Sequence, residues 1–225
     1  MTDNRHDMRL IAAYVRAQAE DAVSDDLLRR PLYELDEADM AALYAIGTRR
    51  GLKLYRFKDH EELPRVKKTI GFLKGVQPES LLDVGSGRGV FLFPFIREFP
   101  WVQVTSLDML DHRVELMNAL TKGGVENLTA HREDICTWDM ADKSFDVVTM
   151  LEVLEHIPDV NAAVRAAVRL ARRYVVVTVP SKPDDNPEHI HLLTKEVLEK
   201  MFYEAGCKKL SFDGVNGHLF MVASL

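Results

Sequence analysis

The sequence predicts an α/β fold with a doubly wound, mostly parallel sheet, and three observations lead to that prediction. Strand-like and helix-like segments alternate from residue 80 to about residue 205. The segments FDVVTM and YVVVTV are apolar almost throughout, as expected for strands of a parallel sheet that is covered on both faces. In the segment LLDVGSGRGVFLF (81–93), three glycines follow the end of the first strand, at the edge where such sheets bind their ligands.

The strands and helices of this region can be placed in order along the chain. We expect strands at 80–84, 102–107, 128–131, 145–150 and 174–179. We expect helices at about 90–98, 112–122, 160–172 and 194–205. The last 18 residues, KKLSFDGVNGHLFMVASL, contain two strand-like runs around GVNG, which predicts an antiparallel hairpin.

The first third of the chain has helical periodicity and no strand pattern. Apolar residues recur every three or four positions in 8–23 and in 36–51, and the second segment ends at Gly51. A further helix is expected within 60–76, with Pro64 near its start. We therefore divide the chain into a helical N-terminal extension, 1–60, and an α/β domain, 61–225.

Composition and charge exclude several classes of protein. The 225 residues are 47% hydrophobic and 28% charged, which is ordinary for a globular protein with a sizeable core. No apolar stretch approaches the roughly 18–20 residues that span a bilayer, and the polar N-terminus lacks a signal-peptide core. Two cysteines without metal spacing fit a reducing, cytoplasmic location. A net charge of −6 argues against non-specific coating of nucleic acid.

The glycine-rich segment indicates a ligand that contains a nucleoside. Gly85, Gly87 and Gly89 are spaced G-x-G-x-G, one residue tighter than the dinucleotide fingerprint G-x-G-x-x-G. Asp108 ends the next strand, where a carboxylate can accept from both hydroxyls of a ribose. Asp134 lies just past the third strand and can accept from an adenine amino group.

With these residues in place, 81–180 resembles the class I S-adenosylmethionine-dependent methyltransferases. The resemblance implies a seven-stranded sheet that ends in an antiparallel hairpin, and S-adenosylmethionine as cofactor. It assigns Asp108 to the ribose, Met109 to a face of the adenine, and Asp134 with Ile135 to the adenine edge. The remaining cofactor-binding positions that we expect are Asp83, Gly85, Ser86, Gly87, Gly89 and Glu152.

Two other interpretations of the loop are weaker. The glycines could serve only the close packing of strand and helix, with Asp108 and Asp134 as solvated turn residues. A nicotinamide-dependent oxidoreductase is disfavoured because the third glycine is misplaced for a pyrophosphate.

In this fold, N-terminal elements often cover the mouth of the active site, so we expect the extension 1–60 to act as a cap.

A second group of polar residues follows the fourth strand, in TMLEVLEHIPDV (149–160). Glu152, Glu155 and His156 stand at i, i+3 and i+4, so one helical turn would place them on one face. The loop after the fifth strand, PSKPDDNPEHIHLLTKEV, should bring His189 and His191 to the same edge. Two carboxylates and two imidazoles can bind a divalent ion such as Mg²⁺, Mn²⁺ or Fe²⁺.

This group resembles the metal-dependent 2′-O-methyltransferases that modify the 3′ end of small RNAs. Those enzymes use an E-x-x-E-H element and a histidine ahead of a W-T-R run. The resemblance implies the ligands Glu152, Glu155, His156 and His189. The sequence departs from the pattern because Leu193 and Lys195 replace the Trp and Arg, and His191 stands where an aromatic is expected.

The same residues also resemble small-molecule methyltransferases, including the ubiquinone-pathway O-methyltransferases, in which EVLEH and HxHxxT occur without a required metal. In that case Glu152 contacts the cofactor, and His156 caps a helix or acts as a general base. The catalytic candidates are His156, Glu155 and His189, and a purely structural role for them remains an alternative.

The segment 49–68 combines basic and aromatic residues. It holds eight Lys or Arg against three Asp or Glu, with Tyr55 and Phe57 between them. This composition suits single-stranded nucleic acid or an anionic metabolite, but the rings can equally pack on the core while the charges face water. Arg65 is a candidate partner for the cofactor's carboxylate.

Three functions follow. The first is a methyltransferase that acts on a small-molecule acceptor, with oxygen favoured over nitrogen or carbon as the acceptor atom. The second is a metal-dependent RNA 2′-O-methyltransferase, and the third is a non-catalytic S-adenosylmethionine-binding partner protein. DNA is not an expected substrate, because LEVL replaces the Asn/Asp-Pro-Pro-aromatic turn of enzymes that methylate base amines. A membrane partner is not expected, and the chain is expected to be a monomer or a homodimer.

Overall fold

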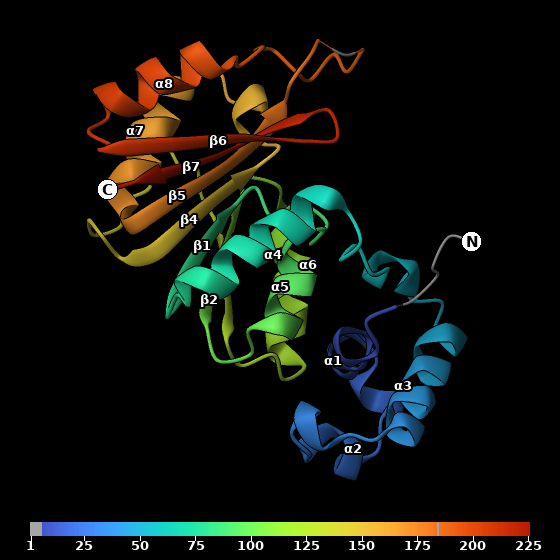
Figure 1. Ribbon diagram of the computed structural model, residues 1–225. Coiled ribbons are helices and arrows are strands. Elements are labelled where there is room, and N and C mark those ends of the chain that lie inside the picture. Colours follow the sequence, from blue (N-terminus) through green and yellow to red (C-terminus); the bar gives the residue numbers. More distant parts are fainter. Residues whose placement is uncertain (1–5, 184) are drawn as a thin grey trace.

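The computed structural model describes residues 6–183 and 185–225, and Figure 1 shows their arrangement. A seven-stranded sheet has the order β3-β2-β1-β4-β5-β7-β6. The strands β1 to β5 are parallel neighbours, β7 is antiparallel to β5, and β6 is antiparallel to β7. The strands are β1 Ser80–Val84, β2 Gln103–Asp108, β3 Leu128–Arg132, β4 Phe145–Leu151, β5 Ala171–Pro180, β6 Lys209–Val215 and β7 His218–Ser224. The predicted fold class is confirmed.

Helices cover both faces of this sheet (Figure 1). The α-helices are α1 Met8–Gln18, α2 Asp25–Arg29, α3 Glu37–Arg49, α4 Pro64–Val76, α5 Leu92–Glu98, α6 Asp111–Lys122, α7 Val160–Leu170 and α8 Lys195–Glu204. Short 3₁₀ helices are η1 Glu20–Ala22, η2 Leu32–Glu34, η3 Leu54–Phe57 and η4 Leu154–His156. Leu81 packs in the core under α4, α5 and α6, and its neighbour Leu82 packs in the core under α7 and α8. This alternation is the two-residue period of a strand buried on both faces.

The C-terminal hairpin closes on the turn that the sequence predicts. Asn216 and Gly217 have φ values of 38° and 85°, so both central residues are left-handed. Asn-Gly is the preferred pair for such a two-residue hairpin turn, because its twist matches that of the strands. The turn places His218 opposite Pro180, at the carboxyl end of β5.

Two predicted helices end earlier than expected. The segment 8–23 is not one helix, because α1 ends at Gln18 and Ser24 starts α2 by accepting the Leu27 amide at 3.4 Å. The segment 160–172 also ends early, because the chain leaves α7 at Leu170 and pairs with β4 from Ala171 onward. No glycine or proline marks that second boundary, so strand pairing decides it against helix propensity.

The N-terminal extension shares a hydrophobic core with the sheet. Leu10, Ile11 and Val15 of α1 are buried in one cluster with residues of β1 and α5. Helix α1 packs against α3 and α6, and a Cβ on Gly123 would lie 1.8 Å from the carbonyl oxygen of Ala13. These helices thus flank the α5–α6 layer, and their expected role as an active-site cap stays a prediction. Within the described ranges no helix has the length and apolar character needed to cross a bilayer.

Candidate functional site

The glycine loop follows β1 and combines tight packing with an open position. Gly85, Gly87 and Gly89 have φ values of 65°, 56° and 78°, a region that side-chain-bearing residues avoid. A Cβ on Gly85 would lie 2.6 Å from Val153, and one on Gly89 would lie 2.4 Å from the Phe93 ring. A Cβ on Gly87 would meet nothing closer than the Gly85 carbonyl oxygen at 3.7 Å. Packing therefore explains two of the glycines, whereas Gly87 borders open space.

The carboxylate of Asp108 connects the end of β2 to this loop. It accepts the amide of Gly87 at 3.0 Å through one oxygen and the amide of Leu110 at 3.0 Å through the other. Next to it, the side chain of Met109 is 62% exposed, so it is available to a planar ligand. The predicted cofactor residues on β1 and β2 thus lie side by side.

The third acidic position lies beyond β3. Asp134 is half-buried, and its carboxylate accepts the amide of Cys136 at 2.9 Å, which fixes the turn. The side chain of Ile135 is buried in the core under α7, so its backbone is the part that a ligand can reach. This geometry is compatible with the expected contact to an adenine edge.

A small cavity of about 150 Å³ opens between the glycine loop and the end of β4. Its walls include Arg65, Asp83, Gly85, Ser86, Gly87 and Glu152. The carboxyl of Asp83 is buried and accepts the hydroxyl of Thr149 at 2.7 Å. Burial raises the pKa of Asp83 to about 7, since the charged form loses its hydration. A buried carboxyl of this kind fits a ligand that brings a cationic group.

The expected helical turn at 152–156 is wrong. Glu152 has a φ of 59°, and only Leu154–His156 form a short helix, η4. The carboxylate of Glu152 instead pairs with the Nε2 atom of His218 at 2.9 Å and borders the Asp83 cavity. Sequence reasoning missed His218, although its place beside the GVNG turn was a signal, since the hairpin had to lie next to β5.

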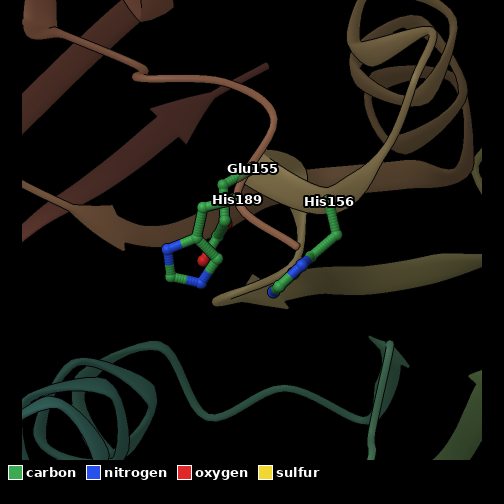
Figure 2. A group of neighbouring side chains, drawn as sticks. All are labelled: Glu155, His156 and His189. Carbon is green, nitrogen blue, oxygen red and sulfur yellow. The ribbon is translucent and has the colours of Figure 1, made fainter. Parts of the chain in front are cut away.

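Three of the four proposed metal ligands do come together. Ligand atoms of Glu155, His156 and His189 lie within 4.8 Å of one another, and Glu152 is not among them. Figure 2 shows Glu155 and His156 on η4 and His189 on the loop that follows β5. The amides of Ile190 and His191 donate to the Glu155 carbonyl at 3.0 and 3.3 Å, which holds this loop against η4.

The histidines of this cluster have distinct orientations. His156 places Nδ1 2.9 Å from the Glu188 carbonyl oxygen, and the rings of His156 and His189 are 4.8 Å apart at 70°. Because a carbonyl can only accept, Nδ1 of His156 carries a proton, so in the neutral ring Nε2 is the nitrogen with the free lone pair. His191 directs Nε2 to the Ile157 carbonyl at 3.0 Å and serves the loop instead.

Some residues of the basic-aromatic segment 49–68 pack in the core, and others are accessible to a ligand. Phe57 is fully buried against Tyr14 and Phe93, with ring centroids 5.2 and 5.5 Å away. Tyr55 is 68% exposed, and Arg65 lies at the Asp83 cavity. This segment therefore contributes one ring to the core and one cation to the candidate site.

Comparison with known proteins identifies the family. Residues 55–211 match the profile of a family described as "Methyltransferase domain". The chain belongs to this methyltransferase family. It is accordingly an S-adenosylmethionine-dependent methyltransferase, and the open position at Gly87 beside the buried Asp83 carboxyl fits that cofactor.

The sequence identity to individual relatives is low. A "Ubiquinone biosynthesis O-methyltransferase" of Neisseria meningitidis is 27% identical over 168 residues, which cover 72% of this chain and 68% of the relative. One of the same name from Serratia proteamaculans is 35% identical over 101 residues, 44% of this chain and 40% of the relative. A crystal structure of a "SAM dependent methyltransferase" from Aquifex aeolicus has a TM-score of 0.59 at 18% identity, covering 73% of this chain and 91% of that one. At this identity, the likeness to the Aquifex aeolicus structure shows the fold alone.

Proposed function

We propose that this methyltransferase transfers a methyl group from S-adenosylmethionine to an oxygen atom of a small-molecule acceptor, and that His156 accepts the proton of the acceptor's hydroxyl. The observation that carries the proposal is the 2.9 Å contact of His156 Nδ1 with the Glu188 carbonyl. It fixes the tautomer in which Nε2 can take a proton, as a general base requires. The names of the sequence relatives support oxygen as the acceptor atom.

Residues at the carboxyl ends of three strands would hold the cofactor. The carboxylate of Asp108 is fixed by two amides and suits the ribose hydroxyls, and Asp134 suits the adenine amino group. Asp83 suits the ammonium of the methionine portion, and Arg65 suits its carboxylate. When bound, this cofactor supplies a methyl group on a positively charged sulfur, which is already primed for displacement. The protein's main task is then to orient the acceptor.

Glu155, His156 and His189 together form what we call the His156 cluster. Apolar side chains beside it favour an organic acceptor with a hydrophobic part. Ile190 and Leu192 are 53% and 46% exposed, and both belong to the loop that carries His189. The hydrogen bond from the Ile190 amide to the Glu155 carbonyl keeps this loop at the cluster. Exposed apolar groups next to a few oriented polar ones are typical of small-molecule sites.

The experiment is transfer of labelled methyl from S-adenosylmethionine into a cell extract that is separated into small-molecule and RNA fractions. The proposal predicts label in the small-molecule fraction, and a reduction of about 100-fold or more in His156→Ala, as for loss of a general base. His112→Ala, an exposed histidine on α6, is the matched control and should keep full activity. Unchanged transfer by His156→Ala would refute the role of this residue.

A second candidate function rests on the proximity of Glu155, His156 and His189. One carboxylate and two imidazoles suit Mn²⁺ or Fe²⁺, and a divalent ion bound there would lower the pKa of an acceptor hydroxyl. An RNA 2′-O-methyltransferase would then place label in the RNA fraction and lose it on chelation. Titration of the protein with Mn²⁺ distinguishes the two candidates, because only the second predicts saturable binding that Glu155→Gln abolishes.

Tight cofactor binding with no label in either fraction would favour the third function, a non-catalytic partner protein. The complete set of Gly87, Asp108 and Asp134 at one edge of the sheet makes us favour catalysis.

A further inference from the structure

The turn of the C-terminal hairpin is fixed at the carboxyl edge of the sheet. The amide and the hydroxyl of Ser181, just after β5, both donate to the Gly217 carbonyl, at 2.9 and 2.7 Å. His218 follows this turn and pairs in register with Pro180, the last residue of β5. Because ligands bind at the carboxyl ends of the strands in such sheets, the hairpin brings a histidine to the edge where the cofactor residues lie.

His218 is held in this place through both ring nitrogens. Nδ1 lies 3.1 Å from the Asn216 carbonyl oxygen, and Nε2 lies 2.9 Å from Oε2 of Glu152. A carbonyl can only accept, so Nδ1 donates to it, and Nε2 donates to the carboxylate when the ring carries its second proton. The side chains of His218 and Glu152 are 25% and 23% exposed, so water and salt screen this contact only in part.

The orientation of the Glu152 carboxylate depends on this contact. The backbone of Glu152 has a φ of 59°, and its amide donates to the Thr178 carbonyl of β5 at 2.9 Å. A left-handed residue with a side chain persists only where neighbouring contacts determine its conformation, and such residues cluster at ligand sites. Among the residues that the structure describes, Oε1 of Glu152 has no hydrogen-bond donor, so His218 supplies the hydrogen bond that orients the carboxylate.

Glu152 also borders the cavity that we assign to the methionine portion of the cofactor. In the described part of the chain, the acidic residues that line this cavity are Asp83 and Glu152. The methionine portion brings two cationic groups, an ammonium and a sulfonium, and one carboxylate. With Arg65 for the carboxylate and Asp83 for the ammonium, Glu152 is the acid that is left for the sulfonium. His218 is not among the described residues that line the cavity, so it acts on the cofactor through Glu152.

We propose that His218 is a positioning residue of the cofactor site, which holds the Glu152 carboxylate at the cavity wall and thereby favours S-adenosylmethionine over the product S-adenosylhomocysteine. This inference rests on the proposed placement of the methionine portion in the Asp83 cavity, and it is independent of the acceptor and of His156. A carboxylate attracts a sulfonium, and this attraction ends when the methyl group leaves, because the sulfur is then a neutral thioether. The contact of His218 with Glu152 therefore favours release of the product.

Calorimetric titration of the full chain with two ligands tests this role. Sinefungin has a carbon with an ammonium group in place of the methylated sulfur, whereas S-adenosylhomocysteine has a neutral sulfur there. In His218→Leu we expect the affinity for sinefungin to fall about fivefold or more, as for the loss of a hydrogen bond to a charged group, and the affinity for S-adenosylhomocysteine to stay within about twofold. His218→Gln is the matched variant, because its amide nitrogen can replace Nε2 as the donor, and it should keep the wild-type ratio of the two affinities.

A double-mutant cycle separates this role from a purely structural one. In Glu152→Gln the ratio of the two affinities should fall as it does in His218→Leu, and combining the two substitutions should lower it no further. Both ligands are measured on the same preparation, so an unfolded fraction does not change the ratio.

The outcomes also separate this inference from the proposed placement of the cofactor. If Glu152→Gln lowered the ratio and His218→Leu did not, the role of His218 alone would be overturned. An equal fall in His218→Gln and His218→Leu would likewise overturn it, because the donor to Glu152 would then not matter. An unchanged ratio in Glu152→Gln would overturn both the inference and the placement of the methionine portion.

Discussion

At the scale of single residues, the environment of Asp83 should make the stability of the protein depend on pH. Its carboxyl is buried, and burial raises its pKa from 3.8 to about 7. Between these two values the folded chain holds a proton that the unfolded chain has released. Stability therefore falls as pH rises, because the contribution is fully present below about pH 4 and is lost as pH passes through about 7.

Asp83→Asn should remove this pH dependence. Each pH unit in the interval corresponds to ~1.4 kcal/mol, so the ligand-free variant should be more stable than the wild type by a few kcal/mol at pH 8 and nearly equal at pH 4. Thermal unfolding of both proteins at several pH values measures the difference. Asp139→Asn, at an exposed position, is the control, and its stability should depend on pH in the same way as that of the wild type. If the stability of Asp83→Asn also followed the pH dependence of the wild type, the buried carboxyl would not titrate in this range.

Gly87→Ala tests the open position of the glycine loop. Its φ of 56° makes an alanine cost ~1–2 kcal/mol of stability, and the added methyl group would project into the open space that we assign to the cofactor. We expect S-adenosylhomocysteine affinity to fall at least tenfold in calorimetric titration. Gly51→Ala is a matched control with φ 68° and nothing within 4 Å, so it should show similar strain and normal affinity. Equal affinities in both variants would contradict the assignment of Gly87.

At the scale of elements, the contact of α1 with the end of α6 holds the extension in place. Gly123→Ala would place a Cβ 1.8 Å from the Ala13 carbonyl oxygen, and backbone cannot yield as a flexible side chain can. We expect a loss of ~1–3 kcal/mol or more in urea unfolding, as in overpacked cores. In contrast, Gly71→Ala in α4 meets nothing within 4 Å and should stabilise the protein by ~0.5–1 kcal/mol. A neutral Gly123→Ala would mean that α1 does not pack so closely.

The order and type of the elements in the α/β domain could be predicted from the sequence, but some ends could not. FDVVTM and YVVVTV read as strands because apolar β-branched runs suit a doubly covered sheet. The GVNG turn was predictable because Asn-Gly tolerates left-handed φ. The end of α7 was not predictable, because alanine and arginine at 171–173 favour a helix and only pairing with β4 makes them a strand.

For the whole molecule, the extension and the sheet share one buried cluster. Leu10, Ile11 and Val15 belong to the same core as Leu81 and Phe95. We therefore expect one cooperative unfolding transition for the full chain, with coincident curves from circular dichroism and from the fluorescence of Trp101 and Trp138. Two separated transitions would show that the extension is an independent unit.

The candidate site was predictable where it depends on residues close in the sequence to strand ends. Asp108 and the glycine loop fall into this class, since the carboxyl ends of parallel strands meet at one edge. The pairing of Glu152 with His218 could not be predicted: a left-handed residue breaks the expected helical turn, and the place of His218 beside the GVNG turn signals only that it lies at one end of the hairpin. Such long-range pairs depend on strand order, which periodicity does not contain.

The proposed function is methyl transfer to oxygen with His156 as the proton acceptor. The most direct test uses S-adenosylmethionine with a ¹³C-labelled methyl group, an extract of small molecules, and ¹³C NMR of the product. We expect a new resonance of a methyl carbon bonded to oxygen, which disappears in His156→Ala while calorimetric affinity for S-adenosylhomocysteine stays within about twofold. A methyl group on nitrogen or carbon, or an undiminished product signal in His156→Ala, would contradict it.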